Sequence, residues 1–312
     1  MTDRASLKEI LKASEAFKSL RAEQEVAACL ARLGWRTTQS PYYHDGKTDK
    51  LRELDVVASG YWKKPRKAGD LVAKVNLFIE VKSNSDFHIL CAGSTAMPAA
   101  FGNNEYWIGY SEETLKRVEE QLSRFHMEHE DVLDFLHKLE KIAFPRSTMR
   151  TSVLRVKPPP VKHCFSAFRE TNGKSDKGLD NSVLWRATSA LRSAVAAAKT
   201  EKMDGLAADL GTDLEVARRL KLPFPSAMGA IESHTCRINQ YLPIVVIQSR
   251  LWSAELADPE ELKWIRLIQF GTFGDTQGWV DVVNFDHIEE YLRTQSEHFE
   301  QTFRRVRAKR WM

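Results

Sequence analysis

The chain has 312 residues, of which 43% are apolar and 28% are charged, and its net charge is +4. This composition is typical of a globular protein with a sizeable core, and the length is enough for one large α/β domain or two smaller ones. It excludes several classes: no apolar run approaches the ~20 residues that a membrane-spanning helix needs, the four cysteines form no CxxC pair, and the N-terminus has no apolar signal core. We therefore expect a cytoplasmic protein with no membrane partner.

The first half of the chain predicts one helix followed by three strands. Apolar residues recur at helical spacing over Ser6–Leu33, and Gly34 ends the helix. Strands are predicted at Trp35–Tyr43, Arg52–Ser59 and Val75–Ser83. A long basic loop at residues 61–70 joins the second of these strands to the third, so the two are expected to pair as a hairpin. Further short strands are expected at residues 87–90 and 106–110.

The second half of the chain mixes helices with strands. A charged helical insertion is predicted at about 111–147, and KPPPVKH at residues 157–163 is the clearest break. A helix is predicted at Asn181–Lys199, with Asn181 as its N-cap. The remaining predicted elements are strands at Leu242–Gln248, Trp264–Phe270 and Trp279–Val283, and a last helix from Asp286 to about Arg307 with a basic tail.

This order of elements predicts an α/β fold with a central mixed β-sheet flanked by helices. The break before residue 157 divides the chain into 1–156 and 157–312. The second part either completes the sheet that the first part begins or forms a separate lobe, and the pattern leaves both open.

The segment FIEVKSN, residues 78–84, carries an acid and a base on one face of an apolar strand. Because side chains alternate along a strand, Glu80 and Lys82 point the same way, and Leu77, Ile79 and Val81 point the other way. Pairing with the preceding strand would bring Asp55 to the same end of the sheet. Two carboxylates ~4–5 Å apart repel each other unless something neutralises them, and a divalent cation does so well.

This arrangement predicts a magnesium site with a lysine beside it. The ion would polarise a phosphodiester and lower the pKa of a bound water, and Lys82 would orient that water or stabilise charge in the transition state. The alternative is an ordinary solvated strand face, on which an exposed ion pair with Asp55 would contribute only ~0–1 kcal/mol.

Three segments resemble the PD-(D/E)xK phosphodiesterase superfamily, which includes restriction endonucleases, Holliday-junction resolvases and many defence nucleases. ELDVVAS at Glu53–Ser59 stands where those proteins carry the metal-binding aspartate, and IEVKS at Ile79–Ser83 stands where they carry (D/E)xK. EQEVAACLARLGW at Glu23–Trp35 resembles their first core helix with its acidic residue. The resemblance covers about residues 20–90, and it departs from the superfamily's name because Leu54, not proline, precedes Asp55.

Two late segments are similar to a recurring C-terminal half in uncharacterised members of this group. They are YLPIVVIQSRLWSAEL at residues 241–256 and WVDVVNFDHIEEYL at residues 279–292. This likeness implies that the chain forms one elaborated nuclease-like module and is not a nuclease fused to a separate domain that recognises nucleic acid.

The resemblance implies a restriction-endonuclease-like fold and a Mg²⁺-dependent endonuclease, with Mn²⁺ able to substitute. It implies Asp55, Glu80 and the Val81 backbone carbonyl as metal ligands, and Lys82 as the residue that positions the attacking water. Glu23, with Glu25 as the alternative, would add a ligand or hold a second metal-bound water. The implied substrate is DNA, with RNA left open, in restriction or another defence system.

Basic residues predict where nucleic acid would be held. Lys63, Lys64, Arg66 and Lys67 occupy the loop between the two candidate strands, behind the aromatic pair Tyr61–Trp62, and would contact phosphates or stack on bases. The alternative for them is a solvated hairpin tip. Arg169 and Lys174 are further candidates in the polar segment at residues 165–178, which we expect to be a loop.

Partners and rival functions follow from the same features. Cleavage of two strands commonly needs two sites, so a homodimer or partner subunits of a defence system are expected. The alternatives are a nucleic-acid-binding or assembly subunit that keeps the fold without cleavage, and an α/β interaction protein in which these charges are ordinary surface.

Overall fold

The structure is a computed structural model, and its described residues form one large sheet with helices on both faces and a separate two-stranded hairpin. It describes residues 4–46, 48–64, 71–83, 86–95, 161–177, 181–198, 200–201, 237–255, 258–270 and 276–305. The predicted insertion at 111–147, the predicted strand at 106–110 and the boundary between residues 156 and 157 lie outside these ranges.

The central sheet of the described residues is mixed and has ten strands in the order β1-β4-β5-β8-β12-β11-β7-β6-β9-β10. The strands from the first part of the chain are β1 (Arg36–Gln39), β4 (Val56–Lys64), β5 (Leu71–Lys82) and β6 (His88–Ser94). Those from the second part are β7 (Cys164–Thr171), β8 (Arg237–Ile247), β9 (Leu251–Ser253), β10 (Glu260–Leu262), β11 (Trp264–Phe270) and β12 (Thr276–Asn284). The prediction of a large mixed sheet flanked by helices is confirmed.

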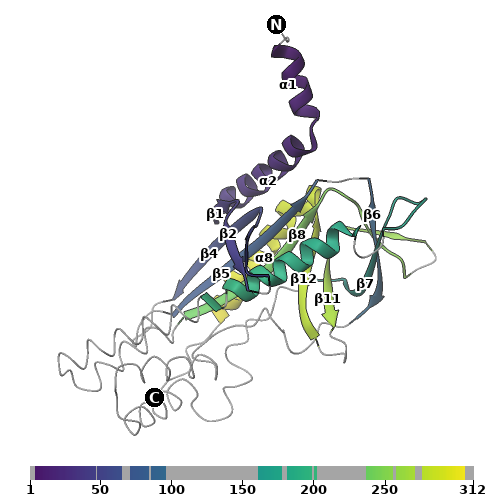
Figure 1. Cartoon of the computed structure of the whole chain (residues 1–312). Coiled ribbons are helices and arrows are strands. Elements are labelled where there is room, and N and C mark those ends of the chain that lie inside the picture. The colour runs from purple at the N-terminus through teal and green to yellow at the C-terminus, as the bar shows by residue number, and fades with distance from the viewer. Residues whose placement is uncertain are drawn as a thin grey trace, which may run out of the picture.

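Strand β5 is the third strand from the β1 edge of this sheet and has two long neighbours. It pairs antiparallel with β4, with Val56 opposite Ile79, and parallel with β8, with Lys82 opposite Ile247. Segments far apart in sequence therefore lie side by side, as Figure 1 shows for β5 and β8. A strand that is buried on both faces carries apolar residues at successive positions, and this explains the run Leu242–Ile247 in β8.

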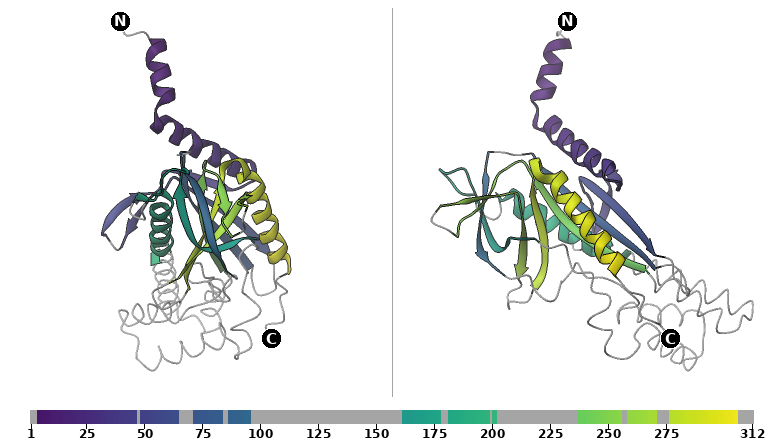
Figure 2. Two further views of the ribbon diagram at one scale, coloured as in Figure 1. Left: turned by 90° about the vertical axis from the view of Figure 1, so that its right-hand side faces the viewer. Right: turned by 180° about the vertical axis from the view of Figure 1, so that it is seen from behind.

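Helices cover both faces of the sheet. The described helices are α1 (Arg4–Ala13), α2 (Glu15–Arg32), a helix over residues 183–198, the short 3-10 helix η3 (Phe285–His287) and α8 (Ile288–Arg305), and all but α1 lie against the sheet (Figure 1). The left view of Figure 2 shows the helix over residues 183–198, in teal, and α8, in yellow, on opposite sides of the strands. Among the described residues, no helix is long and apolar enough to cross a membrane.

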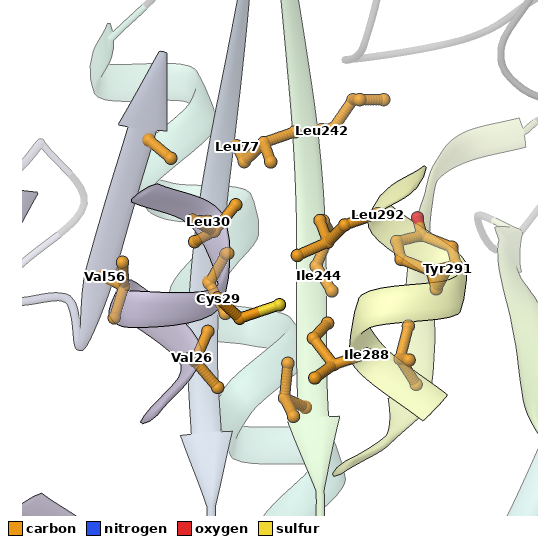
Figure 3. Packing of buried hydrophobic residues seen from close by; sticks show 14 of the residues in the cluster. Val26, Cys29, Leu30, Val56, Leu77, Leu242, Ile244, Ile288, Tyr291 and Leu292 are labelled. Atoms are coloured by element: carbon orange, nitrogen blue, oxygen red, sulfur yellow. The ribbon is translucent and has the colours of Figure 1, made fainter. Parts of the chain in front are cut away.

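The face covered by α2 and α8 buries one apolar cluster. Figure 3 shows Val26 and Leu30 of α2 and Leu292 of α8 packed around Val56 and Ile244 of the sheet. Leu30 is fully buried, and removing a side chain of this size from water contributes about 1.5–3 kcal/mol. Val26 and Leu30 are four residues apart and therefore lie on one side of α2, which is the side that packs on the sheet.

The opposite face buries a second cluster under the helix over residues 183–198. Leu184 and Leu191 of that helix pack with Phe78, Val245 and other residues of the strands. Because side chains alternate along β5, Glu80 and Lys82 share the face of Phe78. The charged face predicted from FIEVKSN is therefore covered by a helix over part of its length.

Several element boundaries differ from the prediction. The helix expected at Ser6–Leu33 is two helices, because the Ser14 side chain accepts a hydrogen bond from the Phe17 N–H and caps α2. Helix α1 projects away from the sheet in Figures 1 and 2. The strand expected at Trp35–Tyr43 divides into β1 and the first strand of a separate hairpin, β2 (Tyr42–Asp45) with β3 (Lys50–Glu53).

Two further predictions were wrong: the N-cap of the helix over residues 183–198, and the loop expected before that helix. The N-cap is Ser182 in place of Asn181, since the Ser182 Oγ accepts from the Trp185 N–H at 2.9 Å. The segment expected to be a loop at residues 165–178 is largely strand β7, because it pairs with β6 and β11.

Candidate active site

Asp55 lies in the short link between β3 and β4, not within a strand as predicted. The β4–β5 register, with Val56 opposite Ile79, sets Asp55 across from Glu80. The Asp55 Oδ2 atom accepts a hydrogen bond from the Val81 N–H at 2.6 Å. This bond holds the carboxylate at the end of the sheet, where β5 finishes.

Lys82 joins the two predicted carboxylates. Its Nζ atom lies 2.6 Å from the Glu80 Oε2 and 3.4 Å from the Asp55 Oδ2. The Glu80 side chain is only 8% exposed, whereas those of Asp55 and Lys82 are 21% and 27% exposed. The alternative of a fully solvated strand face therefore does not describe this cluster.

Burial and neighbouring charges shift the pKa values of Glu80 and Lys82. Burial raises the pKa of the Glu80 carboxyl to about 7; the Lys82 ammonium opposes that rise, and the Asp55 carboxylate adds to it. Burial alone would lower the pKa of Lys82, but the Glu80 and Asp55 carboxylates outweigh it, so that pKa is raised. Lys82 is therefore protonated at neutral pH, and Glu80 titrates near it.

Glu23, on α2, interacts electrostatically with the cluster. Its side chain is buried at 9% exposure, and it accepts a hydrogen bond from the Ser19 Oγ at 3.2 Å. Burial raises the pKa of Glu23, and the Asp55 charge raises it further, while Ser19 and Lys82 act the other way. Glu25, the alternative, instead pairs with Arg21 on the exposed side of α2.

The Val81 carbonyl faces the same edge as Asp55. In a strand, the N–H and C=O of one residue point to the same neighbour. Since the Val81 N–H meets Asp55, its carbonyl faces that side too, whereas the Lys82 carbonyl accepts from the Gln248 N–H at 3.1 Å on the β8 side. The geometry is compatible with the predicted role of Val81 as a backbone ligand.

A cavity of about 540 Å³ opens above Glu80 and Lys82. One wall is the β2–β3 hairpin and the other is the helix over residues 183–198, and the Tyr43 hydroxyl joins them by donating to the Ala190 carbonyl at 3.1 Å. The lining residues are Tyr43, Arg52, Glu53, Glu80, Lys82, Val183, Arg186, Ala187 and Ala190. Sequence reasoning missed both walls, because no local pattern brings a helix a hundred residues downstream over β5.

Lys63 and Lys64, the two predicted basic residues of the hairpin that the structure describes, have backbones far from this cluster. The backbones of Lys63 and Lys64 belong to β4, a correction of the predicted loop, and lie at the end of the hairpin away from Asp55. That end is roughly 26 Å along the strand at ~3.3 Å per residue. Arg66 and Lys67 lie outside the described residues.

Arg169 and Lys174 are also distant from the cluster. Arg169 belongs to β7, four positions from β5 in the strand order, or about 19 Å at ~4.8 Å per strand. Its side chain is 77% exposed and lies 3.9 Å from the Asp176 carboxylate. Lys174 is exposed in the turn that follows β7.

The cluster suits a cation bound by two carboxylates. Glu23, Asp55 and Glu80 are three acidic groups that interact electrostatically with the Lys82 ammonium, and burial is the main cause of the raised pKa values of Glu23 and Glu80. Over the described part of the chain, no three His, Cys, Asp or Glu side chains are grouped closely enough to hold one ion. Mg²⁺ does not require such a group, since it is commonly bound by one or two carboxylates, waters and substrate phosphate.

The fold and the site define an α/β protein whose mixed sheet carries a partly buried Asp–Glu–Lys cluster beneath an open cavity. In comparisons with known proteins, no family model, no curated protein and no solved structure matches the chain.

Proposed function

We propose that this protein is a metal-dependent endonuclease of the PD-(D/E)xK superfamily, with a restriction-endonuclease-like fold, that hydrolyses phosphodiester bonds of DNA. One observation carries the proposal. Asp55 and Glu80 share the Lys82 ammonium at 3.4 and 2.6 Å, at the end of adjacent strands and beside a cavity open to a substrate.

In this proposal Asp55 and Glu80 hold Mg²⁺, with Mn²⁺ able to substitute and the Val81 carbonyl as a further ligand. Bound there, the ion supplies charge for the scissile phosphate and a lower pKa for a coordinated water. Asp55 is kept in place for this role by the Val81 N–H. Glu23 holds a second water at the α2 side of the cluster.

Lys82 orients the attacking water and stabilises the negative charge that develops on the phosphate. Its raised pKa keeps the ammonium protonated at neutral pH, so it donates hydrogen bonds and does not act as the base. Glu80, with its pKa of about 7, changes its protonation state in the same range and must be ionised to bind a cation.

The proposal is tested by incubating the protein with supercoiled plasmid, linear duplex DNA, single-stranded DNA and RNA, each with Mg²⁺, Mn²⁺ or EDTA. We expect cleavage of DNA that requires the divalent cation. Lys82→Ala and Glu80→Gln should each lower the rate by at least about 100-fold, because each removes a group that acts on the transition state. Lys263→Ala is the matched control, since Lys263 forms an exposed ion pair with Glu290.

Two outcomes would contradict the proposal. One is the absence of cleavage of every substrate with every cation, and binding without cleavage would then favour the nucleic-acid-binding subunit. The other is cleavage that Lys82→Ala and Glu80→Gln leave at the wild-type rate, which would assign the activity to other residues.

The biological setting and assembly are also proposals. A role in restriction or other defence rests on the superfamily resemblance alone. A homodimer, or a complex with partner subunits, would supply a second site for the second strand, and light scattering with and without duplex DNA measures that assembly.

A further inference from the structure

Three cationic side chains line the cavity, and two of them already have carboxylate partners. Lys82 is held by Glu80 and Asp55, and the Arg52 Nε lies 2.7 Å from the Asp45 Oδ2. Arg186 differs: within the residues that the structure describes, its guanidinium has no hydrogen-bond or ion-pair partner, and the residue is exposed. The cavity wall thus presents one uncompensated positive charge near the Glu80–Lys82 pair.

Arg186 lies on the side of its helix that lines the cavity. Val183, Arg186, Ala187 and Ala190 recur at the three- and four-residue spacing of one helix face, and all four line the cavity. The two alanines next to Arg186 leave room above Glu80, so that a long side chain can extend over the cavity mouth.

Hydrogen bonds hold the helix that carries Arg186 at two points, one at its start and one a turn beyond Arg186. The Glu170 carboxylate, 3% exposed, accepts hydrogen bonds at 2.7 Å from the Leu184 N–H and the Ser182 hydroxyl at the helix start. One turn beyond Arg186, the Ala190 carbonyl accepts from Tyr43 of the hairpin. A side chain between two such anchors starts from a preorganised backbone, which reduces the entropy lost on binding.

The chemistry of a free guanidinium at this place fits a phosphate. Arginine is planar, always charged and weakly hydrated, and its paired N–H groups match two phosphate oxygens. Among the described lining residues, Glu53 on the facing hairpin is exposed and has no ion-pair partner, so it repels an anion and favours the helix side as the place to hold one.

We propose that Arg186 binds a backbone phosphate of the nucleic acid that enters this cavity, next to the bond held over Glu80 and Lys82. The proposal rests on the proposed function for the identity of the ligand, but it concerns binding and not the chemical step. Among the described residues, Arg186 takes the phosphate-binding role that was predicted for Lys63 and Lys64, whose backbones lie at the far end of β4.

The test measures binding apart from cleavage. Fluorescence anisotropy with labelled 20-base-pair duplex and single-stranded DNA, in EDTA, gives the dissociation constant over a range of KCl concentrations. Arg186→Ala should weaken duplex binding about tenfold, the worth of one charge-assisted hydrogen-bonded contact, and reduce the salt slope by about 0.9. Arg186→Lys should restore the salt slope but only part of the affinity, because an ammonium cannot form the paired contact.

Arg293→Ala is the matched control. Arg293 is an exposed arginine of α8, paired with Glu289, on the other face of the sheet, and its loss should leave binding unchanged. The melting temperature of Arg186→Ala should equal that of the wild type, because an exposed arginine without a partner adds little to folding.

The outcomes separate this inference from the proposed function. If the wild type cleaves DNA and Arg186→Ala binds and cleaves as the wild type does, the inference is overturned and the nuclease remains. If the wild type binds DNA without cleaving it and Arg186→Ala loses affinity, the inference stands and the nuclease is overturned. If the wild type binds neither nucleic acid form, both are overturned.

Discussion

At the scale of single residues, Asp55, Glu80 and Lys82 are in contact at the end of β5, and Glu23 interacts with them electrostatically. Asp55 and Glu80 are anchored by backbone and lysine contacts, while Glu23 is held mainly by Ser19. The Lys82 ammonium neutralises part of the negative charge, and the pKa values of Glu23 and Glu80 remain raised in spite of it. Burial is the main cause of these raised values, and a bound cation would oppose it by stabilising the ionised carboxylates.

This balance predicts how Glu80 titrates. Its pKa of about 7 lies above the ordinary value of 4.5, so the carboxyl is protonated below pH 7 and ionised above it. Lys82→Met should raise this pKa further, because the group that opposes burial and the Asp55 charge is removed. Carbon-detected NMR of labelled glutamate carboxyls measures the titration, with Lys263→Met as the control that leaves it unchanged.

The raised pKa of Glu80 also predicts how activity depends on pH. Protons compete with a cation for Glu80, so metal-dependent cleavage should rise as pH increases through about 7 and level off above it. A Glu80 pKa that stays near 4.5, or that falls in Lys82→Met, would contradict this description of the cluster.

At the scale of elements, a buried ion pair joins β11, β12 and α8. The Arg266 guanidinium and the Asp281 carboxylate are almost fully buried and form two hydrogen bonds of 2.6 and 2.7 Å. The Tyr291 hydroxyl donates to Asp281 at 2.6 Å, and the Trp279 ring lies 3.8 Å from the arginine. Together they tie α8 to the strands beside β8.

We predict that breaking this group is far more harmful than an ordinary surface change. Asp281→Asn leaves the buried arginine uncompensated and should lower the free energy of unfolding by about 3–5 kcal/mol. Tyr291→Phe removes one hydrogen bond to the carboxylate and should lower it by about 1–3 kcal/mol. Urea denaturation measures both; a loss below ~1 kcal/mol for Asp281→Asn would mean that the pair does not support the fold as described.

The elements also show what the sequence can predict. Strand β11 begins and ends where the alternation and aromatic residues predicted, at Trp264 and Phe270. The buried pair could not be foreseen, because Arg266 sits between Ile265 and Leu267 and alternation alone assigns it to a solvent face. Strand β7 was missed because its polar sequence becomes a strand only when β6 and β11 lie beside it.

The candidate site likewise has one part that the sequence predicts and another part that it does not. Asp55, Glu80 and Lys82 lie on one hairpin, so alternation and strand pairing were enough to predict their meeting. Arg186 and the Ala190–Tyr43 contact depend on a helix more than a hundred residues away, for which the local sequence gives no pairing signal.

At the scale of the whole molecule, the two parts of the chain build one sheet. The β5–β8 pairing runs from Val72 opposite Arg237 to Lys82 opposite Ile247, so the strand that carries Glu80 has a neighbour from each part. The helix over residues 183–198 lines the cavity beside Glu80 and Lys82. The cluster, its cavity and Arg186, the proposed phosphate-binding residue, are therefore formed by residues from both parts of the chain.

The central claim is that Asp55 and Glu80 hold a divalent cation beside Lys82. The most direct measurement is the anomalous scattering of manganese in crystals of the full chain soaked with Mn²⁺, compared with crystals of Glu80→Gln. The account predicts an anomalous peak between the Asp55 and Glu80 carboxylates in the wild type, and its loss in the variant. A wild-type map with no peak at that position, while the protein still cleaves DNA with Mn²⁺, would contradict it.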